Sequence, residues 1–267
     1  MEVTGPAAAA AAWLLWMEEA GVDACILEPG ASVAPAAHRG HVLPPPAPRP
    51  PSGPPAHGVP EVERRIADAR ALARSCRTLA ELEEVLRHFD LCPLAATATR
   101  LCFADGSPEA ELFLVGEAPG AAEDRLGRPF VGPSGRLLDR MLAWVGLDRS
   151  RVWITNTVFW RPPGNRPPTS AELALCLPFL ERQIALVRPK VLLFLGGLAA
   201  RVLLGVNEGV SRLRGRQFVY ASDDLPQPVP AFVTYHPAYL LRQPVHKRYA
   251  WRDLLAVTEL LGVNGFR

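Results

Sequence analysis

The chain has 267 residues, a formal net charge of +2 and 49% hydrophobic residues. This length allows one catalytic domain with extensions, and the hydrophobic content is ample for a buried core, which excludes wholesale disorder. The small net charge gives no indication of a nucleic-acid partner. However, all but two of the 29 basic residues are arginines, which suit bidentate phosphate contacts. The five cysteines are odd in number and contain no CxxC spacing, which favours a reduced, cytoplasmic protein.

The first 60 residues differ in composition from the rest. Residues 1–28 hold a short apolar stretch with no basic start and with acids after it, so neither a secretory signal nor a membrane span fits. We expect a short helix there that docks on the next domain or on a protein partner. Residues 29–60 contain 11 prolines, which indicate a semi-stiff linker, either a spacer or a docking segment. Residues 61–267 form the predicted catalytic domain.

Beyond residue 60, helical spacing of apolar residues alternates with short apolar runs. The expected strands are 111–115, 151–156, 190–196 and 230–235. The expected helices are 61–76, 78–89, 134–146, 169–187, 197–205 and 247–262. Capping boxes begin two of these helices, one at Thr78 and one at Thr169. Apolar strands separated by helices predict an α/β fold of three αβα layers around a central, mainly parallel four-stranded sheet.

In such a sheet the ligand site lies outside the carboxyl ends of the strands. The segments found there are GEAPG from Gly116, TN ending at Asn156, GG at 196–197, and HPAYLL from His236. These four segments are the predicted location of the chemistry.

Three longer runs contain these segments, in the order LFLVGEAPGAAEDRLGRPFVGPSGRLLDRML, WITNTVFWRPPGNRPPTSAELALCLPFL and VTYHPAYLLRQPVHKRYAWRDLL. Together they resemble the family-4-type uracil-DNA glycosylases, from about residue 75 to the C-terminus. The resemblance implies a uracil-DNA glycosylase-like fold and a monofunctional enzyme of base excision repair, which hydrolyses the bond between uracil and deoxyribose. It implies uracil-containing DNA as partner, a monomer, and no membrane.

The resemblance also implies catalytic roles. Glu117 is expected near the scissile bond, and His236 is expected to donate a hydrogen bond to O2 of the leaving uracil, where negative charge develops. The wider superfamily has an aspartate that orients water at the place of Ala118. Because this chain lacks that aspartate, Glu117 or Asp124 is expected to orient the water.

Further residues are expected to bind the base. Gly116 and Ala118 let the backbone approach a ligand, the Phe130 ring stacks on the extruded base, and the Asn156 amide reads its edge. The tyrosine that excludes thymine in the superfamily is replaced by Gly120, so this exclusion must come from elsewhere.

The DNA-binding residues expected from the same resemblance lie in two segments. Leu240 matches the apolar wedge that enters the duplex, and Tyr239 is expected to share this task. Arg242, Arg161 and Arg166 are expected to contact phosphates, and the alternative for these charges is a solvated surface.

The cysteines depart from the family pattern. Most family-4 enzymes hold a [4Fe–4S] cluster on four cysteines, but this chain keeps two of those positions, Cys92 and Cys176, and has Phe89 and Trp160 at the others. A cluster needs thiolate ligands. We therefore expect no cluster, no metal and no other cofactor, with Phe89 and Trp160 as apolar core.

Three alternatives stay open. One is a non-catalytic module that binds uracil or abasic DNA, or that accompanies a polymerase. Another is a metal hydrolase that uses Glu123, Asp124 and His236, which the absence of an HExxH spacing disfavours. In the third, Cys76 and Cys102 replace the missing cluster ligands.

Overall fold

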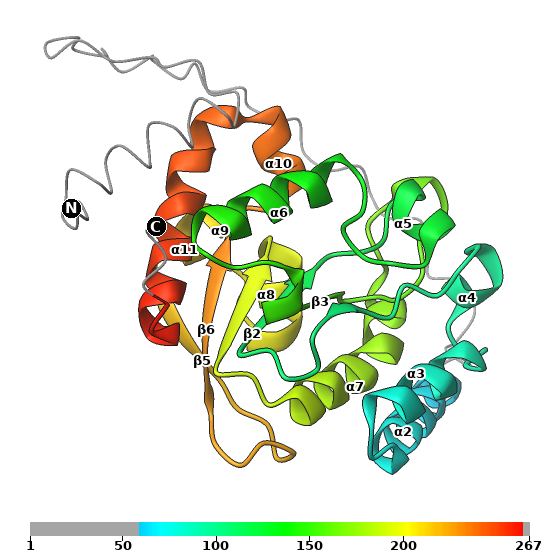
Figure 1. The fold of residues 1–267 in the computed structure, drawn as a ribbon. Helices are drawn as coiled ribbons and strands as arrows, with labels where there is room; N and C mark the ends of the chain where they lie inside the picture. Colours follow the sequence, from blue (N-terminus) through cyan, green and yellow to red (C-terminus); the bar gives the residue numbers. More distant parts are fainter. Residues whose placement is uncertain (1–58, 264–267) are drawn as a thin grey trace, which may run out of the picture.

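The computed structural model describes residues 59–263, which form three layers with a six-stranded sheet between two groups of helices (Figure 1). The strands are β1 (Asp105–Gly106), β2 (Leu112–Gly116), β3 (Val152–Asn156), β4 (Val191–Leu195), β5 (Gln217–Tyr220) and β6 (Val229–Thr234). Their order in the sheet is β1-β3-β2-β4-β6-β5. The four inner strands are parallel, and β1 and β5 pair antiparallel at the two edges.

The helices lie on both faces of this sheet (Figure 1). They are α2 (Val59–Ser75), α3 (Leu79–Arg87), α4 (Pro93–Thr97), α5 (Ala121–Leu126), α6 (Pro133–Trp144), α7 (Ser170–Val187), α8 (Gly197–Leu204), α9 (Val210–Leu213), α10 (Pro237–Arg242) and α11 (Lys247–Leu261). One core joins α2, α3, α7 and α8 to the sheet, and the other joins α6, α10 and α11 to its opposite face.

Alternation along the strands supplies both cores. Leu112 and Leu114 of β2 point into the α6 side, whereas Phe113 and Val115 point into the α7 side. Every residue of β2, β3 and β4 is buried, as expected for parallel strands covered on both faces.

The predicted three layers and four parallel strands are confirmed, but the sheet has two more strands than predicted. β1 has two residues, Asp105 and Gly106, and β5 has four, two of them exposed, so both are shorter than the apolar runs of the predicted strands. The short helices α4, α5, α9 and α10 were also not predicted, because four to six residues are too few to show a helical period.

The two predicted capping boxes have different outcomes. Thr169 and Glu172 exchange both hydrogen bonds at the start of α7. Thr78 accepts from the Glu81 amide as predicted, but the Glu81 carboxylate accepts from the Arg77 amide instead of closing the box on Thr78.

The predictions for residues 1–28 and for most of 29–60 lie outside the described residues. At the boundary, α2 begins at Val59, slightly before the predicted domain. Within residues 59–263, no helix combines the length and apolarity needed to cross a membrane.

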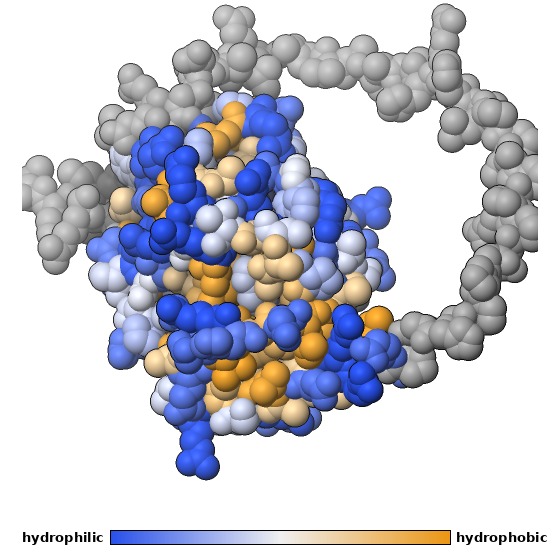
Figure 2. All heavy atoms as spheres, turned by 90° about the vertical axis from the view of Figure 1, so that its right-hand side faces the viewer, coloured by the Kyte–Doolittle hydropathy of each residue, from blue (hydrophilic) through white to orange (hydrophobic). Residues whose placement is uncertain are grey.

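The face that carries α2 and α3 mixes apolar and charged side chains (Figure 2). Leu72, Val85, Phe89 and Leu91 line a groove of about 410 Å³ between these helices. Nothing in the described residues indicates what covers it.

Candidate active site

The segments predicted to hold the chemistry meet at the carboxyl edge of the inner strands. Gly116 ends β2 and is in register with Asn156, which ends β3. His236 follows β6 and caps the N-terminus of α10. The structure therefore brings together three parts of the chain that are far apart in sequence.

Gly116 makes room for two of these side chains. A β carbon on Gly116 would lie 2.5 Å from the Phe130 ring and still closer to Oδ1 of Asn156. Only glycine permits this approach, so the expectation that a small residue is needed at this position has a direct steric reason.

The loop that carries Phe130 is held in an uncommon conformation. Phe130 has a φ of 53°, in the left-handed region, and its carbonyl oxygen lies where a side chain on Gly135 would be. Arg149 donates to the carbonyl oxygens of Pro129 and Phe130, and it also pairs with Asp139. These contacts fix the ring against Gly116.

Glu123 holds the same loop from the other side. Its Oε1 accepts from the amides of Val131 and Gly132 at 2.9 and 2.8 Å, and the side chain is buried. Its Oε2 lies 2.8 Å from the place of a β carbon on Gly120. From the sequence, Glu123 was expected only as a metal ligand of a disfavoured alternative, and neither its role in holding this loop nor that of Arg149 was predicted.

His236 is arranged as a neutral hydrogen-bond donor. Its Nδ1 accepts from the Ala238 amide at 3.1 Å, which places the ring proton on Nε2. Burial, assisted by the charge of Arg242, lowers the pKa of His236 to about 4. Its ring lies 5.5 Å from the ring of Phe130, between centroids.

Asn156 has an unsatisfied acceptor at the centre of this group. The residue is 1% exposed, and its Oδ1 has no hydrogen-bond partner among the described residues. A buried acceptor without a partner costs about 1–3 kcal/mol. The site thus contains an acceptor that a ligand with an N–H group would satisfy.

Glu117 lies beside these residues at the end of β2. It is half-buried, and burial raises the pKa of its carboxyl group. Its backbone carbonyl accepts from the Thr157 hydroxyl at 2.6 Å, which ties the GEAPG turn to β3. Ala118, next along the turn, is half-buried against the core on the α7 side.

Asp124 is tied into the fold by both of its carboxylate oxygens. Its Oδ1 accepts from the amides of Thr99 and Arg100, and its Oδ2 accepts from the Thr99 hydroxyl. With both oxygens engaged in a buried position, Asp124 anchors the segment before β1. Its catalytic role stays a prediction beside this structural role.

The two residues predicted to form the wedge lie inside the fold in this structure, and their role on DNA stays a prediction. Leu240 is fully buried in the core on the α6 side, and Tyr239 stacks between Tyr235 and His246 while its hydroxyl pairs with Nδ1 of His246. The neighbouring Leu241 is 40% exposed. The apolar side chain that α10 presents outward is therefore Leu241.

The three predicted phosphate contacts differ in availability. Arg242 is exposed at the end of α10, and its charge reaches His236. Arg161 donates to Asn165, and Arg166 forms a bidentate pair with the buried Glu172. Arg242 is the one of these three without an ion pair among the described residues, and the phosphate roles stay predictions.

The positions of the family cluster are filled by apolar side chains. The Sγ atoms of Cys92 and Cys176 lie 4.0 Å apart in the core. The buried rings of Phe89 and Trp160 stack with 17° between their planes and 6.4 Å between centroids. This confirms the prediction that Phe89 and Trp160 are apolar core.

Cys76 and Cys102 do not replace the missing ligands. Their thiols donate to the backbone oxygens of Leu72 and Glu123, in separate places. The described residues contain no group of three His, Cys, Asp or Glu side chains able to hold a metal.

A parallel sheet with an unsatisfied amide, a neutral imidazole and an aromatic ring at its carboxyl edge is the arrangement of an α/β protein whose site can accept a flat heterocycle. Comparison with known families narrows this class. The model of the uracil DNA glycosylase superfamily matches residues 103–255, and the chain belongs to this superfamily.

Individual relatives agree with this membership. A type-4 uracil-DNA glycosylase of Sulfurisphaera tokodaii is 36% identical over 188 residues, which cover 68% of this chain and 84% of the relative. The type-4 uracil-DNA glycosylase of Pyrobaculum aerophilum is 37% identical, with 66% of this chain and 91% of the relative covered. That of Archaeoglobus fulgidus is 39% identical, with 64% and 87% covered.

Proposed function

We propose that the chain is a monofunctional uracil-DNA glycosylase of base excision repair. The observation that supports this most directly is the buried, unpartnered Oδ1 of Asn156, which lies against Gly116 and the Phe130 ring. The type-4 relatives supply the substrate that fits this site, uracil in DNA.

The side-chain amide of Asn156 recognises uracil by hydrogen bonds. Uracil offers the N3–H donor to Oδ1 of Asn156 and accepts at O4 from Nδ2, while its ring stacks on Phe130. Cytosine offers an acceptor at N3 and a donor at N4, so two buried groups would remain unpaired, at about 1–3 kcal/mol each. Sites built on such hydrogen bonds discriminate strongly.

The imidazole of His236 assists the departure of the uracil base. Cleavage of the glycosidic bond places negative charge on the uracil ring and positive charge on the sugar. The neutral His236 donates from Nε2 to O2, where the negative charge develops, while the Ala238 amide keeps the ring in this tautomer.

Water attacks the sugar with the help of Glu117. The carboxylate at the end of β2 stabilises the positive charge on the sugar and orients the water. The chain has two lysines, Lys190 at the start of β4 and the buried Lys247 in α11, and neither is in a site motif. Hydrolysis, and not lyase chemistry through a Schiff base, is therefore the proposed reaction.

Exclusion of thymine is assigned to Glu123. Its Oε2 lies 2.8 Å from the place of a β carbon on residue 120. The carboxylate thus lies beside the position of the missing tyrosine, where we propose that a 5-methyl group would meet it.

The proposed enzyme works without an iron–sulfur cluster. Two thiols beside the stacked rings of Phe89 and Trp160 do not fit a group that needs four thiolates. Protein purified without oxygen is expected to contain iron far below one atom per chain. Stoichiometric iron with visible cluster absorbance would contradict this proposal.

The proposed working form is a cytoplasmic monomer bound to DNA. The four described cysteines are free, as expected in a reducing compartment. A single sedimenting species at the mass of one chain is the expected result.

The test of the proposed function is release of uracil from a labelled oligonucleotide with one deoxyuridine, as single strand and as duplex. Alkaline cleavage at that position should occur with the natural chain and be lost with Asn156→Ala and His236→Ala. Binding without cleavage by the natural chain would favour the non-catalytic module instead. Cleavage that survives in both variants would contradict the proposed site.

A further inference from the structure

A second cavity lies at the opposite end of the sheet from His236. It has a volume of about 320 Å³ and is lined by α2, α7, α8 and the segment after β5. Tyr220 ends β5 and pairs with Val229, the first residue of β6, whereas His236 lies beyond the last. The cavity is therefore separate from the candidate active site.

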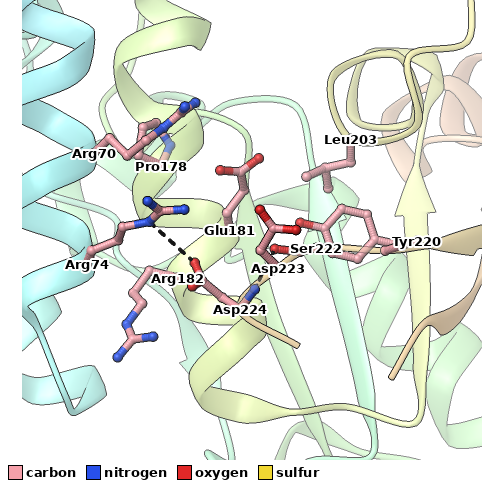
Figure 3. Close-up of a pocket in the computed structure, with 11 residues that line it drawn as sticks. Arg70, Arg74, Pro178, Glu181, Arg182, Leu203, Tyr220, Ser222, Asp223 and Asp224 are labelled. Atoms are coloured by element: carbon pink, nitrogen blue, oxygen red, sulfur yellow. Dashed lines mark hydrogen bonds and ion pairs between the residues drawn. The ribbon is translucent and has the colours of Figure 1, made fainter. Parts of the chain in front are cut away.

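The charges of this cavity are divided between its two sides (Figure 3). Arg70 and Arg74 extend from α2 on one side, and Glu181 and Asp223 lie across from them. Arg74 makes a long ion pair with Asp224, at 3.9 Å. Arg70 has no hydrogen bond or ion pair within that distance to another described residue.

Two polar groups at the acidic side lack direct partners. Tyr220 is 4% exposed, and its hydroxyl, which points toward the acidic side chains in Figure 3, has no hydrogen-bond partner among the described residues. The half-buried carboxylate of Glu181 likewise forms no hydrogen bond or ion pair with any described residue, and burial raises its pKa. Buried groups of this kind are normally paired.

Arg182 has a different role from the other two arginines. Its Nε and Nη2 donate to the backbone oxygen of Cys76 at 2.9 and 2.7 Å. It therefore joins α7 to the end of α2 and fixes the shape of the cavity, while Arg70 and Arg74 remain available to a ligand.

We infer that this cavity binds a small ligand with a guanidinium group at one end and a carboxylate at the other, as in arginine. The guanidinium offers two parallel N–H groups to Glu181 and a further donor to Tyr220. The carboxylate faces Arg70 and Arg74. The volume is at the lower end of the range for ligand sites, which suits an amino acid.

Two sources share this chemistry, free arginine and the C-terminal arginine of a peptide. Calorimetric titration of the full chain with L-arginine and with the dipeptide Ala-Arg distinguishes them, since a closed amino-acid site rejects the dipeptide. L-citrulline, which replaces the guanidinium by a neutral urea, is expected to bind at least about tenfold more weakly than L-arginine. Agmatine, which lacks the carboxylate, is expected to show a similar loss.

Variants test the named contacts. Glu181→Gln should weaken L-arginine binding at least about tenfold, and Tyr220→Phe should weaken it by about threefold. Glu63→Gln, on the exposed face of α2, is the matched control and should leave binding unchanged. Unchanged uracil excision and thermal unfolding would show that Glu181→Gln is folded.

Three results would overturn the inference. They are no heat of binding with millimolar L-arginine or Ala-Arg, equal binding of L-citrulline, and binding that survives in both Glu181→Gln and Tyr220→Phe. None of these results bears on uracil excision, so this inference and the proposed function can fail independently.

Discussion

The rings of Phe130 and His236 lie 5.5 Å apart with 32° between their planes, although one belongs to the loop before α6 and the other to the start of α10. The two helices pack against each other. Glu123 reaches both sides of this pair, because it accepts from the loop amides and its charge acts on His236. The geometry of the site therefore depends on contacts outside the residues that touch the base.

Glu123→Ala should reduce uracil excision and relax the exclusion of thymine. The amides of Val131 and Gly132 lose their acceptor, and the space beside Gly120 opens. We expect a fall in kcat/KM for uracil of about tenfold or more, equivalent to about 1.4 kcal/mol. The ratio of excision at T:G to excision at U:G should rise, as measured on matched duplexes.

Glu123→Gln is the control for this change, since it keeps the shape and one acceptor oxygen. It should retain the exclusion of thymine and lose less activity than Glu123→Ala. An unchanged T:G to U:G ratio in Glu123→Ala would show that the methyl group is excluded elsewhere.

Asp124→Asn should lower stability more than catalysis. The amide oxygen can keep the backbone amides of Thr99 and Arg100, but the oxygen that accepts from the Thr99 hydroxyl is replaced by nitrogen. The negative charge, which lies 3.9 Å from Arg161, is also lost. We expect a loss of about 1–3 kcal/mol in the free energy of unfolding in urea. The kcat for uracil should change less than threefold, or about 0.6 kcal/mol.

Glu117→Gln is the comparison, with the opposite expectation of a large fall in kcat and a small effect on unfolding. If Asp124→Asn abolished turnover in a stably folded protein, its assignment as an anchor would be wrong.

The acidic residues Glu117, Glu123 and Asp124 show which parts of the site can be predicted from the sequence. Motifs that follow apolar strands predict that Asn156, His236 and Glu117 meet at one sheet edge, because parallel strands share a carboxyl end. The separate roles of Glu123 and Asp124 could not be predicted in this way. Both are buried on the same turn of α5, and their distinct partners depend on how α5 packs against two loops.

The leucines of α10 have the same ambiguity. Leu240 and Leu241 are adjacent in a helix of six residues, too short for a periodic pattern to tell the buried side chain from the exposed one. Their burial depends on the core formed with α6 and α11, which the sequence does not specify locally. The short edge strands β1 and β5 were missed for a similar reason.

Leu241→Ala should weaken action on duplex DNA and spare action on single strands. The exposed side chain is the one on α10 able to fill the gap left by an extruded base. We expect kcat/KM on duplex to fall about tenfold, as 1.4 kcal/mol corresponds to this factor. Single-strand activity should be unchanged.

Leu240→Ala provides the contrast, since removal of a buried leucine costs about 2–5 kcal/mol of stability. Leu260→Ala, at an exposed leucine of α11, should change neither quantity. Equal losses on both DNA forms in Leu241→Ala would contradict its role as wedge.

His236 should make stability depend on pH in a defined window. Burial lowers the folded pKa to about 4, whereas an unfolded histidine titrates near 6.5. Between about pH 4 and 6.5 the unfolded chain binds more protons, so stability rises with pH there and is complete above that window. This contribution of His236 to the free energy of unfolding is at most about 3.4 kcal/mol and is lost as the pH falls toward 4.

Urea unfolding across this window, compared between the natural chain and His236→Asn, measures the contribution. The variant should show a shallower dependence on pH, whereas His88→Asn, at an exposed histidine, should keep the natural slope. Uracil excision should show no step near pH 6.5, because the imidazole is already neutral and donates from Nε2. Identical slopes in the natural chain and His236→Asn would show that folding does not lower the pKa of His236, which would contradict a neutral imidazole held by the Ala238 amide.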